Sequence, residues 1–193
     1  PGGITPVKLA LAGAVLTALL SAWTSTLLLL DEETLDEARF WLAGSLAGRG
    51  TDEIRLLFPL ILMAVGAALL LGSSLNTLSL GDETATSLGQ RVVVVRLWSG
   101  FVSVVLAASA VAIAGPIAFV GLAVPHIARS LVGADYRWIT VLGLLFGPSL
   151  LLMADILGRI VVSPQELQVG IVTSLVGAPF LIFLVRSKRL AEL

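Results

Sequence analysis

Residues 115–133, GPIAFVGLAVPHIARSLVG, interrupt a strongly apolar part of the sequence with glycine and proline. Pro116 and Pro125 lack a backbone donor and disfavour helix at the residue before them. Gly115 and Gly121 permit backbone angles that other residues resist. Freed backbone amides are costly in lipid, whereas a broken helix is tolerated where protein encloses it or where it lines a water-filled cavity. The stretch therefore predicts a broken helix in a membrane protein, and a transporter in particular.

The composition also indicates a membrane protein. Hydrophobic residues make up 57% of the chain, charged residues 13%, and the mean hydropathy is +1.01, whereas soluble domains have roughly 25% charged residues. A net charge of −1 and the lack of a basic tract argue against nucleic acid as a partner. The absence of cysteine from the sequence excludes disulfides, thiolate catalysis and cysteine–metal sites within it.

Long uncharged runs predict an all-α, polytopic transmembrane helical bundle that forms a single permease domain over residues 1–193. The acid-rich connector at 31–53 contains Phe40, Trp41 and Leu42, which suit a short helix at the membrane interface. Because the first residue is Pro rather than Met, we expect the natural chain to begin earlier. About six spans are expected, at 7–30, 56–80, 92–114, 122–132, 138–162 and 168–186.

The distribution of Lys and Arg predicts the orientation. If the element after Gly115 crosses the membrane, eight of these residues lie on one side and four on the other. The richer side is expected to be cytoplasmic, which places the 31–53 connector outside. The eight are Lys8, Arg91, Arg96, Arg129, Arg137, Arg186, Lys188 and Arg189.

Few residues in the sequence are candidates for a proton relay, a metal site or the binding of a partner. Asp155 and Arg159 share one helix face, either as a functional pair near membrane depth or as an ordinary local ion pair. Arg159 is expected at the outer surface, where a partner can reach it. His126 is compatible with a proton relay or an iron ligand, but a hydrogen bond that ties the broken backbone is favoured, because the sequence has no second His or Cys for a metal site.

The connector at 81–91 has Asp82 and Glu83 near its start and is compatible with a short cytoplasmic helix or with a solvated loop. Spacing alone favours the solvated loop. The sequence has no GxxxxGK[ST] motif, so it cannot bind ATP by a P-loop. It has no Ser–His–Asp or HExxH pattern either, and no enzyme is predicted. Energy for pumping must come from another subunit or from an ion gradient.

At GPIAFVGLAVPHIARSLVGADYRW, residues 115–138, the chain resembles the FecCD-type permease subunits of binding-protein-dependent ABC importers for iron chelates (siderophores, haem) and cobalamin. The resemblance covers essentially all 193 residues. It implies the fold of type II ABC importer permeases, of which this chain matches the C-terminal part, spans five to ten. Supporting segments are WLAGSLAGR (41–49), SLNTLSLGDETATSLG (74–89) and LLLMADILGRIVVSPQELQVGIVTSLVGAPFLIFLV (150–185).

The resemblance implies a transporter subunit of the bacterial cytoplasmic (inner) membrane that binds no cofactor itself. ATP is used by a separate ABC ATPase. The other implied partners are an extracytoplasmic substrate-binding protein, a second permease subunit in a homo- or heterodimer, and membrane lipid. A ferric siderophore or another iron chelate is the expected cargo, with haem or cobalamin as the alternative. The alternative of another class is an ion-coupled secondary transporter with Asp155 and His126 as proton relay.

The resemblance also assigns residues, none of them catalytic or metal-binding. Arg159 matches the position that meets carboxylates of the binding protein. Tyr136 and Gln168 depart from the family pattern, in which His and Pro are common. The structural residues of the broken helix are Gly115, Pro116, Gly121, Pro125 and His126. The expected ATPase-coupling interface is Asp82, Glu83, Ala85, Ser87, Leu88, Gly89 and Arg91.

Overall fold

The computed structural model describes residues 6–46, 50–161 and 167–186, and each regular element in these ranges is an α-helix. The helices fall into two compact units, one up to Leu42 and the other from Ala43 onward. The predicted all-α fold class is confirmed.

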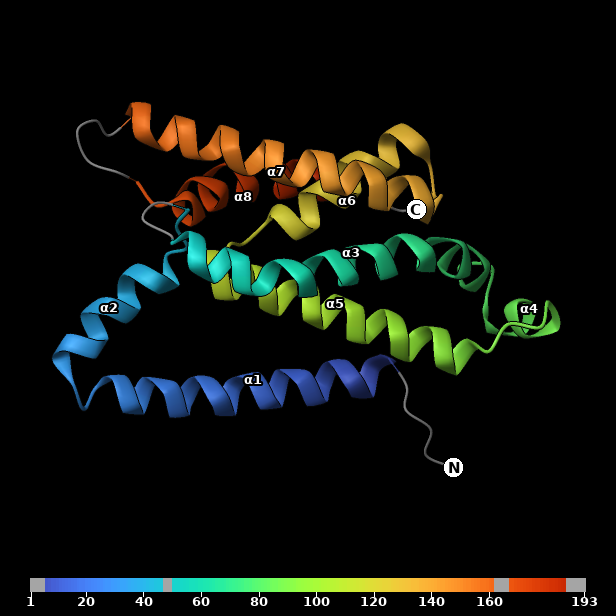
Figure 1. The fold of residues 1–193 in the computed structure, drawn as a ribbon, viewed down its shortest axis with the longest axis horizontal. Helices are drawn as coiled ribbons and strands as arrows, with labels where there is room; N and C mark the ends of the chain where they lie inside the picture. Colours follow the sequence, from blue (N-terminus) through green and yellow to red (C-terminus); the bar gives the residue numbers. More distant parts are fainter. Residues whose placement is uncertain (1–5, 47–49, 162–166, 187–193) are drawn as a thin grey trace. The chain divides into compact units, whose positions relative to one another are not determined.

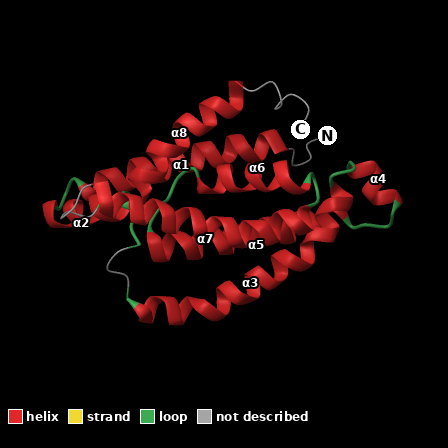
Figure 2. Ribbon diagram, turned by 90° about the horizontal axis from the view of Figure 1, so that it is seen from above, coloured by secondary structure: helices red, strands yellow, loops and turns green. Residues whose placement is uncertain are grey.

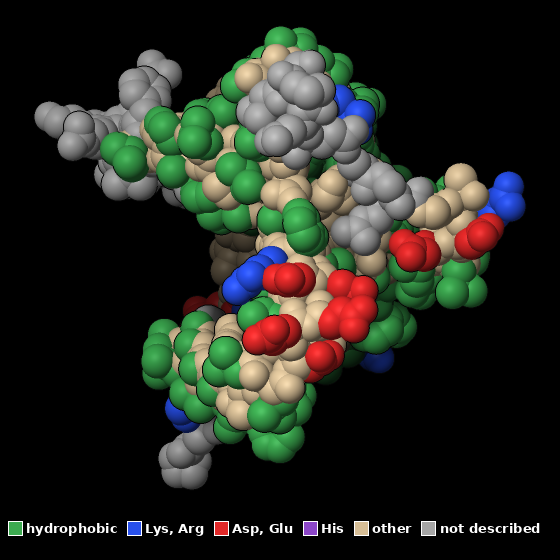
Figure 3. All heavy atoms as spheres, turned by 90° about the vertical axis from the view of Figure 1, so that its left-hand side faces the viewer, with side chains coloured by type: hydrophobic (Ala, Val, Ile, Leu, Met, Phe, Trp, Pro, Cys, Tyr) green, Lys and Arg blue, Asp and Glu red, His purple; other side chains and the backbone are tan. Residues whose placement is uncertain are grey.

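The first unit consists of α1 (Pro6–Leu28) and α2 (Glu32–Leu42). Asp31 begins α2, because its carbonyl accepts the Leu35 N–H at 3.0 Å and its carboxylate accepts the Thr34 hydroxyl. The Thr34 hydrogen bond lowers the pKa of Asp31. Acidic side chains gather over α2 (Figure 3). The apolar group at residues 40–42 ends this helix, and its place at a membrane interface stays a prediction.

The second unit contains the remaining helices. The helix α3 packs against both α5 and α7, and α6 packs against α7 and α8 (Figures 1 and 2). The short α4 joins α3 to α5 and contacts both. The bounds are α3 (Thr51–Leu78), α4 (Asp82–Ser87), α5 (Val92–Ala114), α6 (Val120–Val132), α7 (Tyr136–Val161) and α8 (Val169–Arg186).

Four helical segments are long and apolar enough to cross a membrane, namely Ala10–Leu28, Thr51–Leu78, Val92–Ala114 and Tyr136–Val161. Two further apolar helical segments, Val120–Val132 and Val169–Phe180, are shorter. Large apolar side chains such as Leu70 (81% exposed) and Leu175 (74% exposed) point outward, as lipid-facing positions do. Among the described residues a helix lies in each of the six predicted ranges, and the number that crosses the membrane stays a prediction.

One helix boundary differs clearly from the prediction. The helix α3 begins at Thr51, although the uncharged run begins only at Leu56. Asp52 and Glu53 lie in its first turn, where acidic side chains interact favourably with the helix dipole. Charge therefore marks where an apolar run starts, but not where the helix starts.

Candidate functional site

The interrupted backbone lies between the end of α5 at Ala114 and the start of α6 at Val120. Gly115 ends α5 with a φ of 74°, a conformation that favours glycine. Its N–H donates to the Val111 carbonyl at 2.8 Å. A break at Gly115 and Pro116, as predicted, is therefore present.

Residues 44 and 45 lie against this break, and α8 contacts them in turn. The Ser45 N–H donates to the last α5 carbonyl, that of Ala114, at 2.9 Å. A Cβ placed on Gly44 would lie 2.7 Å from the Pro116 carbonyl oxygen. The Gly170 N–H, at the start of α8, donates to the Gly44 carbonyl at 3.1 Å. Residues 43–45 thus contact both the break and the start of α8.

Phe119 forms the last turn before α6. Its φ is 69° and its ψ is −32°, and the Val120 N–H donates to the Ala118 carbonyl at 2.9 Å. This is a γ-turn with a positive central φ, which is rare and strained. The Phe119 carbonyl then accepts the Ala123 N–H at 2.8 Å and begins the helix.

The break is shorter than predicted. Gly121, Pro125 and His126 all lie inside α6, which is continuous from Val120 to Val132. The Nδ1 of His126 lies 3.0 Å from the Leu122 carbonyl oxygen of the same helix. His126 therefore hydrogen-bonds the backbone of α6, which begins after the interruption, and its predicted role in tying the broken backbone stays a prediction.

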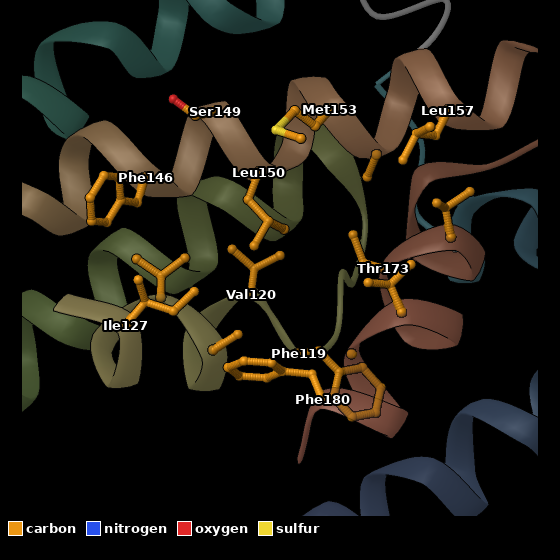
Figure 4. A pocket seen from close by; sticks show the side chains of 16 residues that line it. Phe119, Val120, Ile127, Phe146, Ser149, Leu150, Met153, Leu157, Thr173 and Phe180 are labelled. Carbon is orange, nitrogen blue, oxygen red and sulfur yellow. The ribbon is translucent and has the colours of Figure 1, made fainter. Parts of the chain in front are cut away.

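A cavity of about 400 Å³ lies among α6, α7 and α8, beside the break (Figure 4). The two hydroxyls in its lining donate to their own helices, Ser149 to the Leu145 carbonyl at 2.7 Å and Thr173 to the Gly170 carbonyl at 3.1 Å. The lining is otherwise apolar. The chemistry of the cavity therefore suits apolar groups better than polar or charged ones.

The helix α4 is set between two glycines with positive φ, Gly81 at 103° and Gly89 at 80°. Ala85 is wholly buried, whereas Glu83, Ser87 and the other described candidates of the coupling interface are exposed. Ala85 therefore anchors α4 to the unit. Among the exposed candidates, Leu88 is a large apolar residue that is 65% exposed.

Two polar contacts fix α4 to its neighbours. The Arg96 guanidinium on α5 forms an ion pair with the Asp82 carboxylate at 2.8 Å. The Gln90 side-chain amide donates to the Ser74 carbonyl of α3 at 3.0 Å. The short helix is consequently held by both long helices that flank it.

Asp155 and Arg159 lie near the C-terminal end of α7. The Arg159 Nε donates to the Asp155 carboxylate at 2.9 Å, and the Arg159 side chain is 48% exposed whereas that of Asp155 is 20% exposed. The local ion pair that the spacing allows is thus present. The role of Arg159 in docking stays a prediction.

Several residues that shape these sites were missed by the sequence reasoning. Phe119 contacts Gly177 of α8, because a Cβ on that glycine would lie 2.5 Å from the Phe119 Cβ. Asn76 of α3 bonds Asp135, which precedes α7. An amide near the end of an apolar run, and an acid just before a helix start, are signals that can be read in a sequence. The pairing of Asn76 with Asp135 cannot be read from the sequence.

Comparisons with known proteins agree with the resemblance. The ferric enterobactin transport system permease protein FepD of Escherichia coli (strain K12) is 50% identical over 187 residues, which are 97% of this chain and 56% of that protein. The iron(3+)-hydroxamate import system permease protein FhuB of Bacillus subtilis (strain 168) is 45% identical over 97% of this chain and 49% of its own. This chain thus spans about half the length of the curated relatives it matches.

A solved inward-facing structure assigned to the metal-chelate type of ABC transporter has the same fold, with a TM-score of 0.88 and 36% identity over 94% of this chain and 59% of that one. The model of the FecCD transport family matches residues 1–187. The arrangement of helices, the relatives and the family model agree, and the chain belongs to the FecCD transport family.

Proposed function

We propose that this chain is part of the permease subunit of an ATP-driven, binding-protein-dependent importer of ferric siderophores in the bacterial cytoplasmic membrane. The observation that supports this most is the 50% identity to the ferric enterobactin permease over 97% of the chain. The hydroxamate permease supports the same class of cargo. In this proposal the chain itself binds no cofactor, and a separate ABC ATPase uses the ATP.

The exposed surface of α4 is the proposed contact with that ATPase. Leu88, the C-cap residue of α4, is 65% exposed, and Asp82 and Glu83 lie in the first turn of the same helix. The exposed residues thus combine a large apolar side chain with charges, as the core and rim of protein interfaces do. The surface comprises Asp82, Glu83, Ser87, Leu88, Gly89 and Arg91, with Ala85 as its buried anchor. The contacts of α4 with α3 and α5 would carry its displacement to longer helices.

Arg159 is the proposed contact with an extracytoplasmic binding protein. A guanidinium is permanently charged and suits bidentate pairing with a carboxylate, and the Arg159 side chain is 48% exposed. The complex would be completed by a second permease subunit, identical or related, and by membrane lipid. The apolar lining of the cavity supports a path that holds its cargo weakly.

The test is uptake by the full-length permease reconstituted in vesicles with the ATPase and the binding protein of the same importer. Binding protein loaded with a radiolabelled ferric siderophore is added outside, with ATP inside. We expect uptake that requires ATP and survives a protonophore. Uptake that needs the proton gradient but no ATPase would contradict the proposal and support the ion-coupled carrier with Asp155 and His126. Competition by haem or cobalamin identifies the alternative cargoes.

A further inference from the structure

Asn76, in the last turns of α3, bonds the turn between α6 and α7 with both ends of its side-chain amide. Its Nδ2 donates to the Asp135 carboxylate at 2.6 Å. Its Oδ1 accepts the backbone N–H of Tyr136 at 2.7 Å. A carboxylate and a backbone N–H are the complementary partners of an amide, so both of these polar groups depend on one side chain.

Asp135 in turn begins α7. Its carboxylate accepts the Arg137 N–H at 2.9 Å, and its carbonyl accepts the Ile139 N–H at 2.9 Å. This is the geometry of an N-cap residue. The hydrogen bond from Asn76, followed by that from Arg137, lowers the pKa of Asp135, so the carboxylate is charged at neutral pH.

The backbones of α3 and α7 approach closely at the same place. A Cβ on Gly72, one turn before Asn76, would lie 3.1 Å from the Arg137 Cα. On the far side of the turn, the Arg129 guanidinium of α6 donates to the Tyr136 hydroxyl at 2.8 Å and stands 5.2 Å from its ring centroid. The last turn of α6 and the first turn of α7 are therefore tied together as one hairpin.

The same end of α3 holds α4. The Ser74 carbonyl accepts the Gln90 side chain, and α3 runs through residues 79–81 directly into α4. The end of α3 consequently has α4 attached to it and the α6–α7 hairpin bonded to it through Asn76 (Figure 1).

We propose that Asn76 is a positioning residue that couples α4 to the α6–α7 hairpin, so that a displacement of α4 reaches the helices beside the broken backbone. The inference rests on the proposed function, because the displacement is imposed by the ATPase. Asn76 contacts neither ATPase nor cargo in this account. It acts through Asp135 and Tyr136.

The single variant Asn76→Asp tests the coupling. It removes the donor and places a carboxylate against Asp135, while the contacts that anchor α4 stay intact. In the reconstituted full-length system we expect ATP hydrolysis close to that of the wild type. Transport per ATP should fall on the order of tenfold, since the hydrogen bond to Asp135 is lost and two carboxylates face each other in its place. Thr77→Val is the matched control, because the Thr77 hydroxyl bonds only within α3 in the described contacts, to Ser73 at 3.3 Å.

The exchange variant Asn76→Asp/Asp135→Asn restores a donor and an acceptor between the two positions and keeps acceptors for the Tyr136 and Arg137 N–H groups. We expect it to regain most of the transport per ATP. If the single variant does not accumulate in the membrane, the exchange variant alone tests the proposal. Unchanged coupling in the single variant, or an exchange variant as defective as the single, would overturn the proposal.

Amide hydrogen exchange separates coupling from general loosening. In Asn76→Asp, exchange at residues 136–139 should become faster by about tenfold, with residues 82–90 unchanged. Equal acceleration in both segments would overturn the positioning role. Wild-type vesicles that show no ATP-dependent uptake would instead contradict the proposed function itself, and would do so before any variant is compared.

Discussion

Phe119 holds a backbone conformation that non-glycine residues rarely adopt. It packs against α8, a helix that is far from it in the sequence. The γ-turn at Phe119 costs on the order of 1–3 kcal/mol, so the surrounding packing must hold it in place. Gly177 of α8 supplies that packing, because its missing side chain leaves room for the Phe119 ring. The break in the helix is thus stabilised across the unit.

Gly177→Ala should therefore destabilise the permease. The new Cβ would lie 2.5 Å from the Cβ and Cγ of Phe119, and overpacking of this kind costs about 1–3 kcal/mol. Thermal unfolding of the full-length protein in detergent should show a lower midpoint. Gly143→Ala in α7 is the control, since a Cβ there meets nothing within 4 Å, and alanine is favoured over glycine in a helix by about 1 kcal/mol.

A second variant makes this prediction sharper. Phe119→Gly removes both the side chain and the backbone strain, so combining it with Gly177→Ala should recover much of the lost midpoint. An unchanged midpoint in Gly177→Ala alone would show that Phe119 and α8 do not meet as described.

At the scale of the elements, sequence reasoning located the helices but not all of their ends. Gly115 and Pro116 predicted the interruption because their backbone chemistry acts locally. Pro125, in contrast, does not mark a break. It lies in the second turn of α6, whose first hydrogen bonds are accepted by the Phe119 carbonyl. The contacts of Phe119 with α8 and of Asn76 with Asp135 join residues far apart in sequence, and no local pattern encodes them.

The C-terminal end of α7 allows docking to be separated from local helix support. Arg159→Glu removes the pair with Asp155 and reverses the charge, whereas Asp155→Arg/Arg159→Asp keeps an i,i+4 pair and exchanges the two charges. If Arg159 meets a carboxylate of the binding protein, both variants should lower the affinity for that protein by about 2–5 kcal/mol at unchanged membrane abundance. Titration of labelled binding protein onto reconstituted permease measures this. Full affinity in the exchanged pair would reduce Arg159 to a local role.

At the scale of the whole molecule, the apolar helices bury little of their surface within this chain. In the candidate spans of the second unit only 6–11% of the residues are buried, and hydrophobic side chains such as Leu70 are exposed. Lipid and neighbouring helices must cover these faces in a membrane. The chain spans about half the length of the relatives it matches. We therefore expect transport to require protein beyond these residues.

Sequence alone predicted the class of molecule better than its working contacts. Low charge, long apolar runs and one interrupted helix indicated a transporter. Each follows from the bilayer, which requires apolar spans and tolerates a broken helix only where protein or a water-filled cavity surrounds it. The coupling role of α4 stays a prediction made from the resemblance, whereas its anchoring by Ala85, Arg96 and Gln90 required the structure. Contacts that depend on tertiary packing could not be predicted from one sequence.

The most direct test of the account is a photo-crosslinking residue at Leu88, the exposed apolar position beside α4, in the full-length permease expressed with its ATPase. The account predicts an adduct with the ATPase from position 88. It predicts none from Phe58, which is also exposed but lies towards the opposite end of α3 from α4. An ATPase adduct from position 58 with none from position 88 would contradict the claim that α4 is where ATP hydrolysis acts on this chain.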